Sequence, residues 1–256
     1  MNIVRTRAGL RDSLTSARGG VIGLVPTMGA YHDGHLALFR AARTECDTVV
    51  ASLFVNPAQF AEGADLSRYP RDEERDAALA GQAGVDLLFA PSVEEIYPPG
   101  FETWVEVGEL GNRLEGEHRP GHFRGVATVC LKLFNLVRPQ FAYFGQKDAQ
   151  QVAVLRRMIR DLELELSLRV LPTVRDADGL ALSSRNALLS PSERERALAL
   201  PRALATRDPA AARAALDGLD VDYVEVVDLD PPVLAAAVRV GSTRLIDNIV
   251  LEEASP

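Results

Sequence analysis

The stretch that decides the fold is residues 21–42, VIGLVPTMGAYHDGHLALFRAA, which holds a candidate strand and a candidate helix in succession. Its first five residues are apolar and the run stops at Pro26, which is typical of a buried parallel strand. Three apolar side chains then recur at the spacing of one helix face: Leu36, Phe39 and Ala42. A strand that leads into a helix in this way predicts the first half of a βαβ unit.

Strand and helix patterns continue to alternate from this unit to about residue 173. Further strands are expected at 48–55, 85–90 and 141–144, and helices at 71–83, 126–137 and 152–162. The helix at 126–137 has the clearest pattern, because its apolar residues repeat at i, i+3, i+4, i+7, i+8 and i+11. This rhythm predicts right-handed βαβ units and a doubly wound parallel sheet.

The pattern changes after about Thr173. Ser190 has the features of an N-cap, with Pro191 at the first helical position and Glu193 in the first turn. An Ala- and Arg-rich helical stretch follows to about residue 216, and then three antiparallel strands are expected at 223–227, 237–240 and 244–251. The sequence therefore predicts a first domain of residues 1–173 and a smaller α+β domain of residues 174–256.

The composition is that of a soluble globular protein, which we expect to be cytoplasmic. Of the 256 residues, 47% are hydrophobic and 25% are charged, and both values are ordinary for that class. The net charge of −8 argues against a general nucleic-acid binder, although a local cluster of cations could still hold a nucleotide. Cys46 and Cys130 lie in apolar stretches, which favours reduced core thiols over a disulfide. We expect neither a signal peptide nor a membrane span.

Functional side chains gather first at residues 26–35, between the first strand and its helix. In an open α/β sheet, ligands bind at the carboxyl ends of the strands, and a helix N-terminus there favours phosphate. His32 and His35 project to one side of the first helical turn, and Gly34 between them lets a ligand approach the backbone. The stretch contains neither a Walker loop nor a GxGxxG pattern, so the histidines themselves are the candidate phosphate donors.

Two other interpretations of these histidines stay open at this point. An isolated HxGH is more often a capped helix with two surface histidines. A metal site is the second alternative, because His118 and His122 form another close pair. It is the weaker alternative, since no cysteine or acidic residue joins either pair at a typical zinc spacing.

A second polar stretch, residues 144–151, also follows a strand and opens a helix. Lys147 can reach a phosphate, and Gln151 offers uncharged hydrogen bonds one helical turn later. Asp148 can cap the helix, orient Lys147 or belong to the outer shell of a metal. The alternative is an ordinary strand-to-helix turn with a surface lysine.

Two more polar stretches complete the set. Gln59, in residues 56–60, places a neutral amide at the same edge of the predicted sheet. Ser183, Ser184 and Arg185 lie in a loop and suit a polyphosphate, because arginine can bind two oxygens at once. Taken alone, this loop could equally be a polar surface loop.

The combination of these stretches resembles a known superfamily. The HxGH after the first strand and the Ser-Arg loop after the last sheet strand resemble the HIGH and KMSKS elements of the nucleotidyltransferases. The fuller strings are similar to those of the pantothenate synthetase family, in the right order: VPTMGAYHDGHLAL (25–38), SLFVNPAQF (52–60), LEGEHRPGHFRGVATV (114–129), FGQKDAQQ (144–151) and DGLALSSRN (178–186). The resemblance runs from about Val21 to the C-terminus and includes TRLIDN at 243–248.

Membership of that family implies a Rossmann-like N-terminal domain, a smaller domain that closes over ATP, and a cytoplasmic homodimer. From the net charge and the lack of a long apolar run, we expect neither a nucleic-acid nor a membrane partner. The implied reaction converts ATP, pantoate and β-alanine to AMP, pyrophosphate and pantothenate with Mg²⁺, whose ligands remain unknown. The residues implied to contact ATP are Met28, Gly29, Ala30, Tyr31, His32, Asp33, Gly34, His35, Gly145, Gln146, Lys147, Asp148, Val174, Leu182, Ser183, Ser184 and Arg185. The catalytic residues implied are His35, as proton donor, with His32, Lys147 and Arg185. Gln59 and Gln151 are implied to hold pantoate, and Gln59 also to lie against the β-alanine site.

The chain departs from the family pattern in two places, and three other functions compete with this one. Gln146 stands where many members carry Glu, and the helical stretch before Asp220 is short. A nucleotidyltransferase that stops at an adenylylated product is disfavoured by Gln59 and Gln151. The net charge disfavours an aminoacyl-tRNA synthetase fragment, which would need an RNA-binding surface. A non-catalytic nucleotide sensor would not need the whole set of His35, Lys147 and Arg185.

Overall fold

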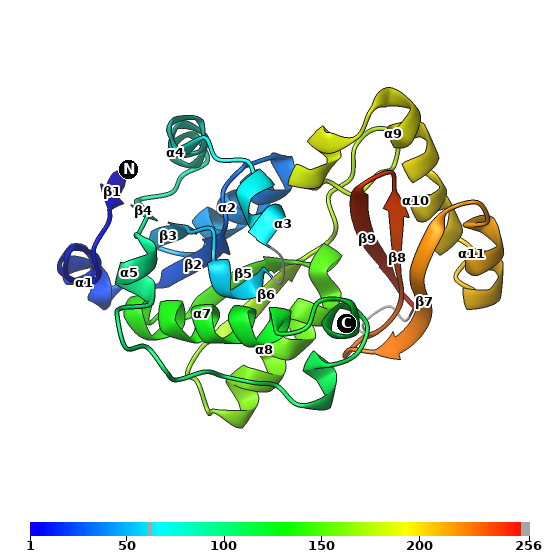
Figure 1. Ribbon diagram of the computed structural model, residues 1–256. Helices are drawn as coiled ribbons and strands as arrows, with labels where there is room; N and C mark the ends of the chain where they lie inside the picture. Colours follow the sequence, from blue (N-terminus) through cyan, green and yellow to red (C-terminus); the bar gives the residue numbers. More distant parts are fainter. Residues whose placement is uncertain (61–62, 252–256) are drawn as a thin grey trace. The chain divides into compact units, whose positions relative to one another are not determined.

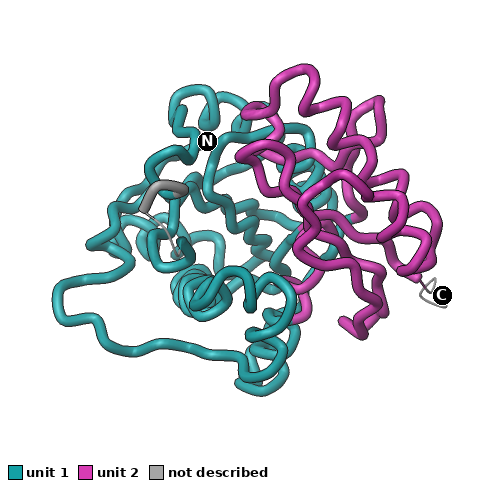
Figure 2. Tube along the Cα trace, turned by 45° about the vertical axis from the view of Figure 1, so that its right-hand side comes forward, with its two compact units in different colours: residues 1–144, 154–171 teal, residues 145–153, 172–256 magenta. Residues whose placement is uncertain are grey.

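The computed structural model describes residues 1–60 and 63–251, which form two compact units (Figure 1). The first unit consists of residues 1–144 and 154–171, and the second of residues 145–153 together with the chain from Pro172 onward (Figure 2). The second unit therefore takes in 145–153, which the sequence-based division places in the first domain. The end of that division, residues 252–256, lies outside the described part of the chain.

The first unit is built on a six-stranded sheet in the order β1-β4-β3-β2-β5-β6. The strands are β1 (Asn2–Val4), β2 (Ile22–Thr27), β3 (Thr48–Leu53), β4 (Leu87–Phe89), β5 (Phe141–Gly145) and β6 (Ser167–Leu171). The pairs β1–β4, β4–β3, β3–β2 and β2–β5 are all parallel. The predicted doubly wound parallel sheet is thus confirmed. The short strands β1 and β6 were not predicted, because neither shows a long apolar run.

Helices accompany this sheet as the strand-helix rhythm requires. They are α1 (Arg7–Leu14), α2 (Asp33–Glu45), α3 (Gly63–Arg68), α4 (Glu73–Gln82), α5 (Val93–Ile96), α6 (Glu115–His118), α7 (His122–Val137) and α8 (Ala149–Asp161), the last beginning in the second unit. Helix α2 packs on β2 and β3 and against α4, whereas α7 packs on β2 and against α1 (Figure 1). Phe39 of α2 and Tyr143 of β5 are fully buried in the same cluster as Val25 of β2.

The second unit has an antiparallel sheet, as predicted, in the order β7-β8-β9. The strands are β7 (Asp220–Asp228), β8 (Pro232–Val240) and β9 (Thr243–Val250). Strand β8 begins five residues earlier than predicted, because its first half includes Ala235 and Ala236, and alanine has a low strand propensity. The first half of β8 is a strand because its residues are buried within the unit, an effect that strand propensity does not describe.

Three short helices form the predicted Ala- and Arg-rich helical stretch: α9 (Pro191–Ala197), α10 (Ala199–Leu204) and α11 (Pro209–Ala215). The predicted cap is confirmed, since the Ser190 side chain accepts from the Glu193 backbone N–H and the Glu193 side chain reaches back. Leu200 and Leu204 of α10 are buried in one cluster with Val238 of β8. This cluster is the core of the second unit.

Other sequence predictions concern the cysteines and the membrane. Both Cys46 and Cys130 are buried free thiols, as predicted. Within residues 1–60 and 63–251, the helices are all too short or too polar to cross a bilayer.

Candidate active site

The loop that follows β2 is held in shape by one buried carboxylate. Asp76 of α4 accepts hydrogen bonds from the backbone N–H groups of Ala30, at 2.7 Å from Oδ2, and Tyr31, at 2.8 Å from Oδ1. Asp76 is only 1% exposed. Hydrogen bonds to a charged acceptor are stronger than neutral ones, so this carboxylate fixes the path of the chain between the strand and α2.

Gly29 is required where this loop begins. Its φ is +89°, a region that side chains disfavour, and Ala30 follows at +54°. A Cβ on Gly29 would lie 2.6 Å from Leu53 Cδ1 and 2.9 Å from Asp76 Oδ2. Tyr31 is buried, and its hydroxyl oxygen accepts from the Thr27 hydroxyl at 3.1 Å. Burial raises the pKa of Tyr31, so its hydroxyl stays neutral.

The two histidines cap the helix that the loop leads into. His32 is the N-cap of α2, and its Nδ1 accepts from the backbone N–H of Gly34 at 3.2 Å. In return, His35 Nδ1 accepts from the backbone N–H of His32 at 3.3 Å. The two ring centroids are 4.2 Å apart. Both imidazole rings therefore lie at the N-terminus of α2, a helix end that favours phosphate.

The contribution of Asp76 to the loop after β2 can be tested by mutation. Asp76→Ala should lower the free energy of unfolding by about 1–3 kcal/mol, because it leaves two buried backbone donors without their acceptor. Denaturant unfolding measures this change, with Asp12→Ala on the exposed face of α1 as the control. A loss no larger than that of the control would show that the loop keeps its shape without Asp76.

Gln59 lies beside this loop. The residue ends the short 3-10 helix η2 (Pro57–Gln59) and is buried, and its Nε2 is 3.2 Å from the sulfur of Met28. Its Oε1 accepts from the Asn56 amide at 3.0 Å. This bond directs the Gln59 amide nitrogen toward Met28. The structure thus brings together two of the stretches that the sequence singled out.

A buried polar network holds Gln59 and its neighbour Asn56 in place. The Asn56 amide also donates to the Gly125 carbonyl at 3.1 Å, and Asn56 Oδ1 accepts from the Tyr97 hydroxyl at 2.8 Å. His122 Nδ1 is 2.9 Å from the Gln59 carbonyl oxygen. Gly125 is needed here, since a Cβ on it would lie 2.3 Å from the Ala58 carbonyl oxygen. His122 is therefore a structural support, and the described residues contain no cluster of three metal-binding side chains.

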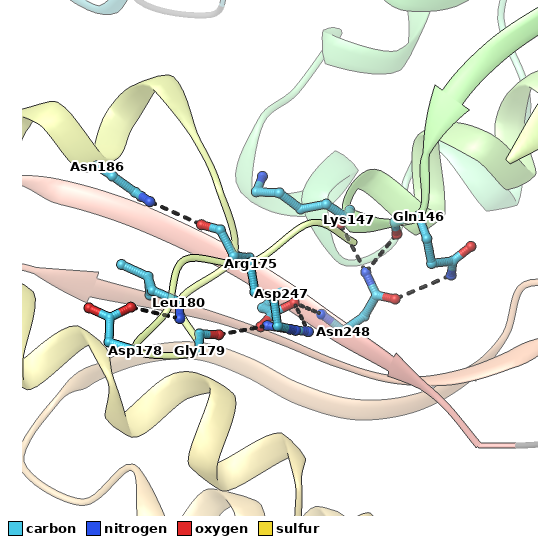
Figure 3. A network of polar contacts seen from close by, with 10 residues as sticks. Gln146, Lys147, Arg175, Asp178, Gly179, Leu180, Asn186, Asp247 and Asn248 are labelled. Atoms are coloured by element: carbon cyan, nitrogen blue, oxygen red, sulfur yellow. Dashed lines mark hydrogen bonds and ion pairs between the residues drawn. The ribbon is translucent and has the colours of Figure 1, made fainter. Parts of the chain in front are cut away.

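In the second unit, one asparagine holds the turn that carries Lys147. The turn is the 3-10 helix η4 (Gln146–Asp148). The Asn248 amide donates to the carbonyl oxygens of Gln146 and Lys147, each at 2.9 Å, as Figure 3 shows. Gln146 Nε2 donates to Asn248 Oδ1 at 3.2 Å. Gln146 therefore supplies a donor that a glutamate at this position could not. Lys147 Nζ lies 3.8 Å from Asp148 Oδ1.

The loop with Ser183, Ser184 and Arg185 follows a small hairpin in the same unit. Val174 and Leu182 close this hairpin through a backbone hydrogen bond of 3.0 Å, and Arg175 pairs with Ala181 as an isolated bridge. The Ser183 hydroxyl oxygen accepts from the Arg185 backbone N–H at 3.3 Å and so caps the 3-10 helix η5 (Ser184–Leu188).

A salt bridge fastens the hairpin to β9. The Arg175 guanidinium donates to both carboxylate oxygens of Asp247, at 2.6 and 3.1 Å (Figure 3). Asp247 is buried, whereas Arg175 is about a third exposed. The geometry is bidentate, the stronger form of this ion pair.

The predicted site residues thus fall into two sets. Met28 to His35 and Gln59 lie in the first unit, whereas the residues from Gly145 to Gln151 and from Val174 to Arg185 lie in the second. Sequence reasoning missed the groups that hold them: the buried Asp76, Asn56, Asp247 and Asn248, and the partly exposed Arg175. In one sequence Asp76 looks like any acidic residue of a charge-rich helix. Asp247 and Asn248 stand within TRLIDN, but nothing local to that string indicates their contacts.

Comparisons with known sequences agree over almost the whole chain. A family profile described as pantoate-beta-alanine ligase matches residues 2–250. Pantothenate synthetase 1 of Bradyrhizobium diazoefficiens is 53% identical over 278 aligned positions, covering 98% of this chain and 98% of that protein. The pantothenate synthetase of Moorella thermoacetica is 50% identical and covers 98% and 99%. Alignments longer than the 256 residues of this chain mean that these relatives have residues which it lacks.

Solved structures agree as well. The pantothenate synthetase of Thermus thermophilus superposes with a TM-score of 0.94 at 48% identity, over 99% of this chain and 100% of that one. The pantoate-beta-alanine ligase of Francisella tularensis, solved with β-γ ATP and β-alanine, superposes with a TM-score of 0.89 at 34% identity. That superposition covers 99% of each chain.

Proposed function

This chain belongs to the pantoate-beta-alanine ligase family, and we propose that it condenses pantoate with β-alanine through a pantoyl-adenylate. The overall reaction consumes ATP and releases AMP, pyrophosphate and pantothenate. One observation in the structure supports this function most directly. The two histidines at the N-terminus of α2 each accept a backbone N–H on Nδ1, which holds both imidazole rings at a helix end that favours phosphate.

The first step joins pantoate to the α-phosphate of ATP. The pantoate carboxylate is already ionised at neutral pH, so it needs no general base before it attacks. A bond forms between a carboxylate oxygen and the α-phosphorus, and the bond from that phosphorus to the bridging oxygen of pyrophosphate breaks. Charge on the phosphorus oxygens and the leaving pyrophosphate must be stabilised, and we assign this to His32, His35, Lys147 and Arg185.

Neutral amides suit the other substrate contacts. Gln59 and Gln151 would hold pantoate by its hydroxyl groups without adding charge beside two anions. The amide of Gln59 is already oriented by Asn56, so little side-chain freedom is lost when substrate binds. In the second step, the neutral amine of β-alanine attacks the acyl carbonyl and a C–N bond forms. The C–O bond to the phosphate breaks, AMP leaves with its electrons, and the nitrogen loses one proton to solvent.

Magnesium is the expected companion of ATP. It commonly binds through one or two carboxylates together with substrate phosphates. Asp148, half exposed and next to Lys147, fits this role. Bound there, Mg²⁺ would neutralise phosphate charge, while Lys147 donates to the same nucleotide.

The products distinguish this function from its competitors. We expect the purified protein to form AMP and pyrophosphate only when ATP, Mg²⁺ and pantoate are all present, and pantothenate only when β-alanine is added. Omitting each substrate in turn while pyrophosphate release is followed tests the order of the two steps. ADP and inorganic phosphate as products would refute the acyl-adenylate. Pyrophosphate release that never leads to pantothenate would instead indicate a nucleotidyltransferase.

The family membership also leads us to propose a cytoplasmic homodimer with no nucleic-acid or membrane partner. The two buried thiols suit a reducing compartment. Sedimentation equilibrium tests the assembly, since a dimer has twice the 27.7 kDa mass of the chain.

A further inference from the structure

Two neighbouring residues of β9 hold both of the segments in the second unit to which we assign ATP contacts. We propose that Asp247 and Asn248 are positioning residues for adenylate formation: Asn248 sets the turn of Lys147, and Asp247 sets the hairpin that leads to Arg185. The proposal rests on the proposed function for the roles of Lys147 and Arg185. Its structural basis lies within the second unit alone (Figure 3).

Both polar atoms of the Asn248 side chain, Nδ2 and Oδ1, form hydrogen bonds to the turn. Its two amide hydrogens go to the carbonyl oxygens of Gln146 and Lys147, and its Oδ1 accepts from Gln146 Nε2. Asn248 is only 4% exposed, so water does not readily replace these bonds. Two hydrogen bonds to consecutive carbonyls leave the turn little freedom to rotate. The direction in which the Lys147 side chain leaves the backbone therefore depends on Asn248.

Asp247 holds the hairpin, as Asn248 holds the turn. Its carboxylate binds the Arg175 guanidinium in a bidentate pair and also accepts from the Asn248 backbone N–H at 2.8 Å. Arg175 in addition donates to the Gly179 carbonyl at 3.2 Å, so the pair ties the strand to the tip of the hairpin. Leu182, where the hairpin closes, is followed by Ser183, Ser184 and then Arg185.

Strand β9 is a suitable anchor because it is regular and well paired. Asp247 lies opposite Ala236 and Asn248 opposite Ala235 in an unbroken register with β8. Successive side chains of a strand leave on opposite faces, so one strand can reach two segments that approach it from different sides. The spacing between the Lys147 turn and the Arg185 loop is then set by a single rigid element. A displacement of about 1 Å in such a group can cost about a hundredfold in rate.

The first test removes the amide of Asn248. Asn248→Ala should slow pantoyl-adenylate formation by at least about tenfold, yet leave the reaction of supplied pantoyl-adenylate with β-alanine within about twofold of the parent. A purely structural role would lower both half-reactions together, in proportion to the folded fraction. If Asn248→Ala proves too unstable, Asn248→Ser keeps one donor and should show the same split with a smaller amplitude.

A matched pair of variants tests Asp247. Asp222 of β7 binds Arg244 of β9 at 2.5 Å and lies 3.7 Å from Arg239 of β8, so Asp222→Asn weakens an ion pair of β9 other than the one between Asp247 and Arg175. Asp247→Asn should slow adenylate formation at least about fivefold, and Asp222→Asn should leave it within about twofold. If Asp247→Asn and Asp222→Asn have equal thermal midpoints and slow adenylate formation equally, the role of Asp247 is overturned.

A double variant decides whether Asn248 acts through Lys147. In a Lys147→Ala background, adding Asn248→Ala should change adenylate formation by less than about twofold, because the group that it positions is already gone. Full additivity of the two losses would overturn the proposal. The parent protein separates this outcome from failure of the function itself, since it must still release AMP and pyrophosphate.

Discussion

His35→Ala is expected to lower turnover by roughly a hundredfold or more, since removing one pre-organised donor to a transition state costs about 2.7–4 kcal/mol. The reason lies in the local geometry, in which His35 Nδ1 accepts from the backbone of His32. This bond holds the imidazole ring at the end of a helix whose dipole favours phosphate. Steady-state turnover with saturating substrates measures the effect.

Two further variants separate this catalytic role from the capping role. Asn in place of His35 can still accept the His32 backbone N–H, but it has no donor where Nε2 lies. His35→Asn should therefore lose as much activity as His35→Ala while unfolding closer to the parent. His118→Ala, at an exposed position of α6, should leave turnover unchanged. Near-normal adenylate formation in folded His35→Ala would leave this histidine only a capping role.

Lys147→Ala is expected to slow pantoyl-adenylate formation by at least about a hundredfold, because it removes the charge that we assign to phosphate stabilisation. A supplied pantoyl-adenylate should still react with β-alanine, since the pyrophosphate has already left in that step. Rapid-quench measurement of each half-reaction separates the two effects. A Lys147→Ala protein that is impaired only in the β-alanine step would contradict the assignment.

Gln151→Ala provides the contrast within the same stretch of chain. Loss of a neutral hydrogen bond costs about 0.5–1.5 kcal/mol, so the KM for pantoate should rise about two- to tenfold. The KM for ATP should stay nearly constant. If ATP affinity falls and pantoate affinity does not, then Gln151 belongs to the nucleotide site.

The regular elements were predictable because their signal is local. The strand at 21–25, the helix with Phe39 and the apolar stripe of 126–137 all follow from residue spacing, and the structure contains each of them. The Ser190 cap and its Pro191 were equally readable. Strand β1 is three residues long and is defined by its pairing with β4, so no local sequence pattern predicts it. Alanines in β8 likewise become strand residues only through burial between neighbouring strands.

The sequence by itself determined which chemistry this protein can carry. The string from Met28 to His35, the turn of Lys147 and the loop of Arg185 are each a short continuous segment, and such segments can be compared directly with known sequences. Only the tertiary structure decided what holds them. Asp76 lies 46 positions from Ala30, and Asn248 lies 102 from Gln146, so these contacts leave no mark on local spacing. A buried polar side chain is stable only with its partners, and folding alone brings those partners within hydrogen-bond distance.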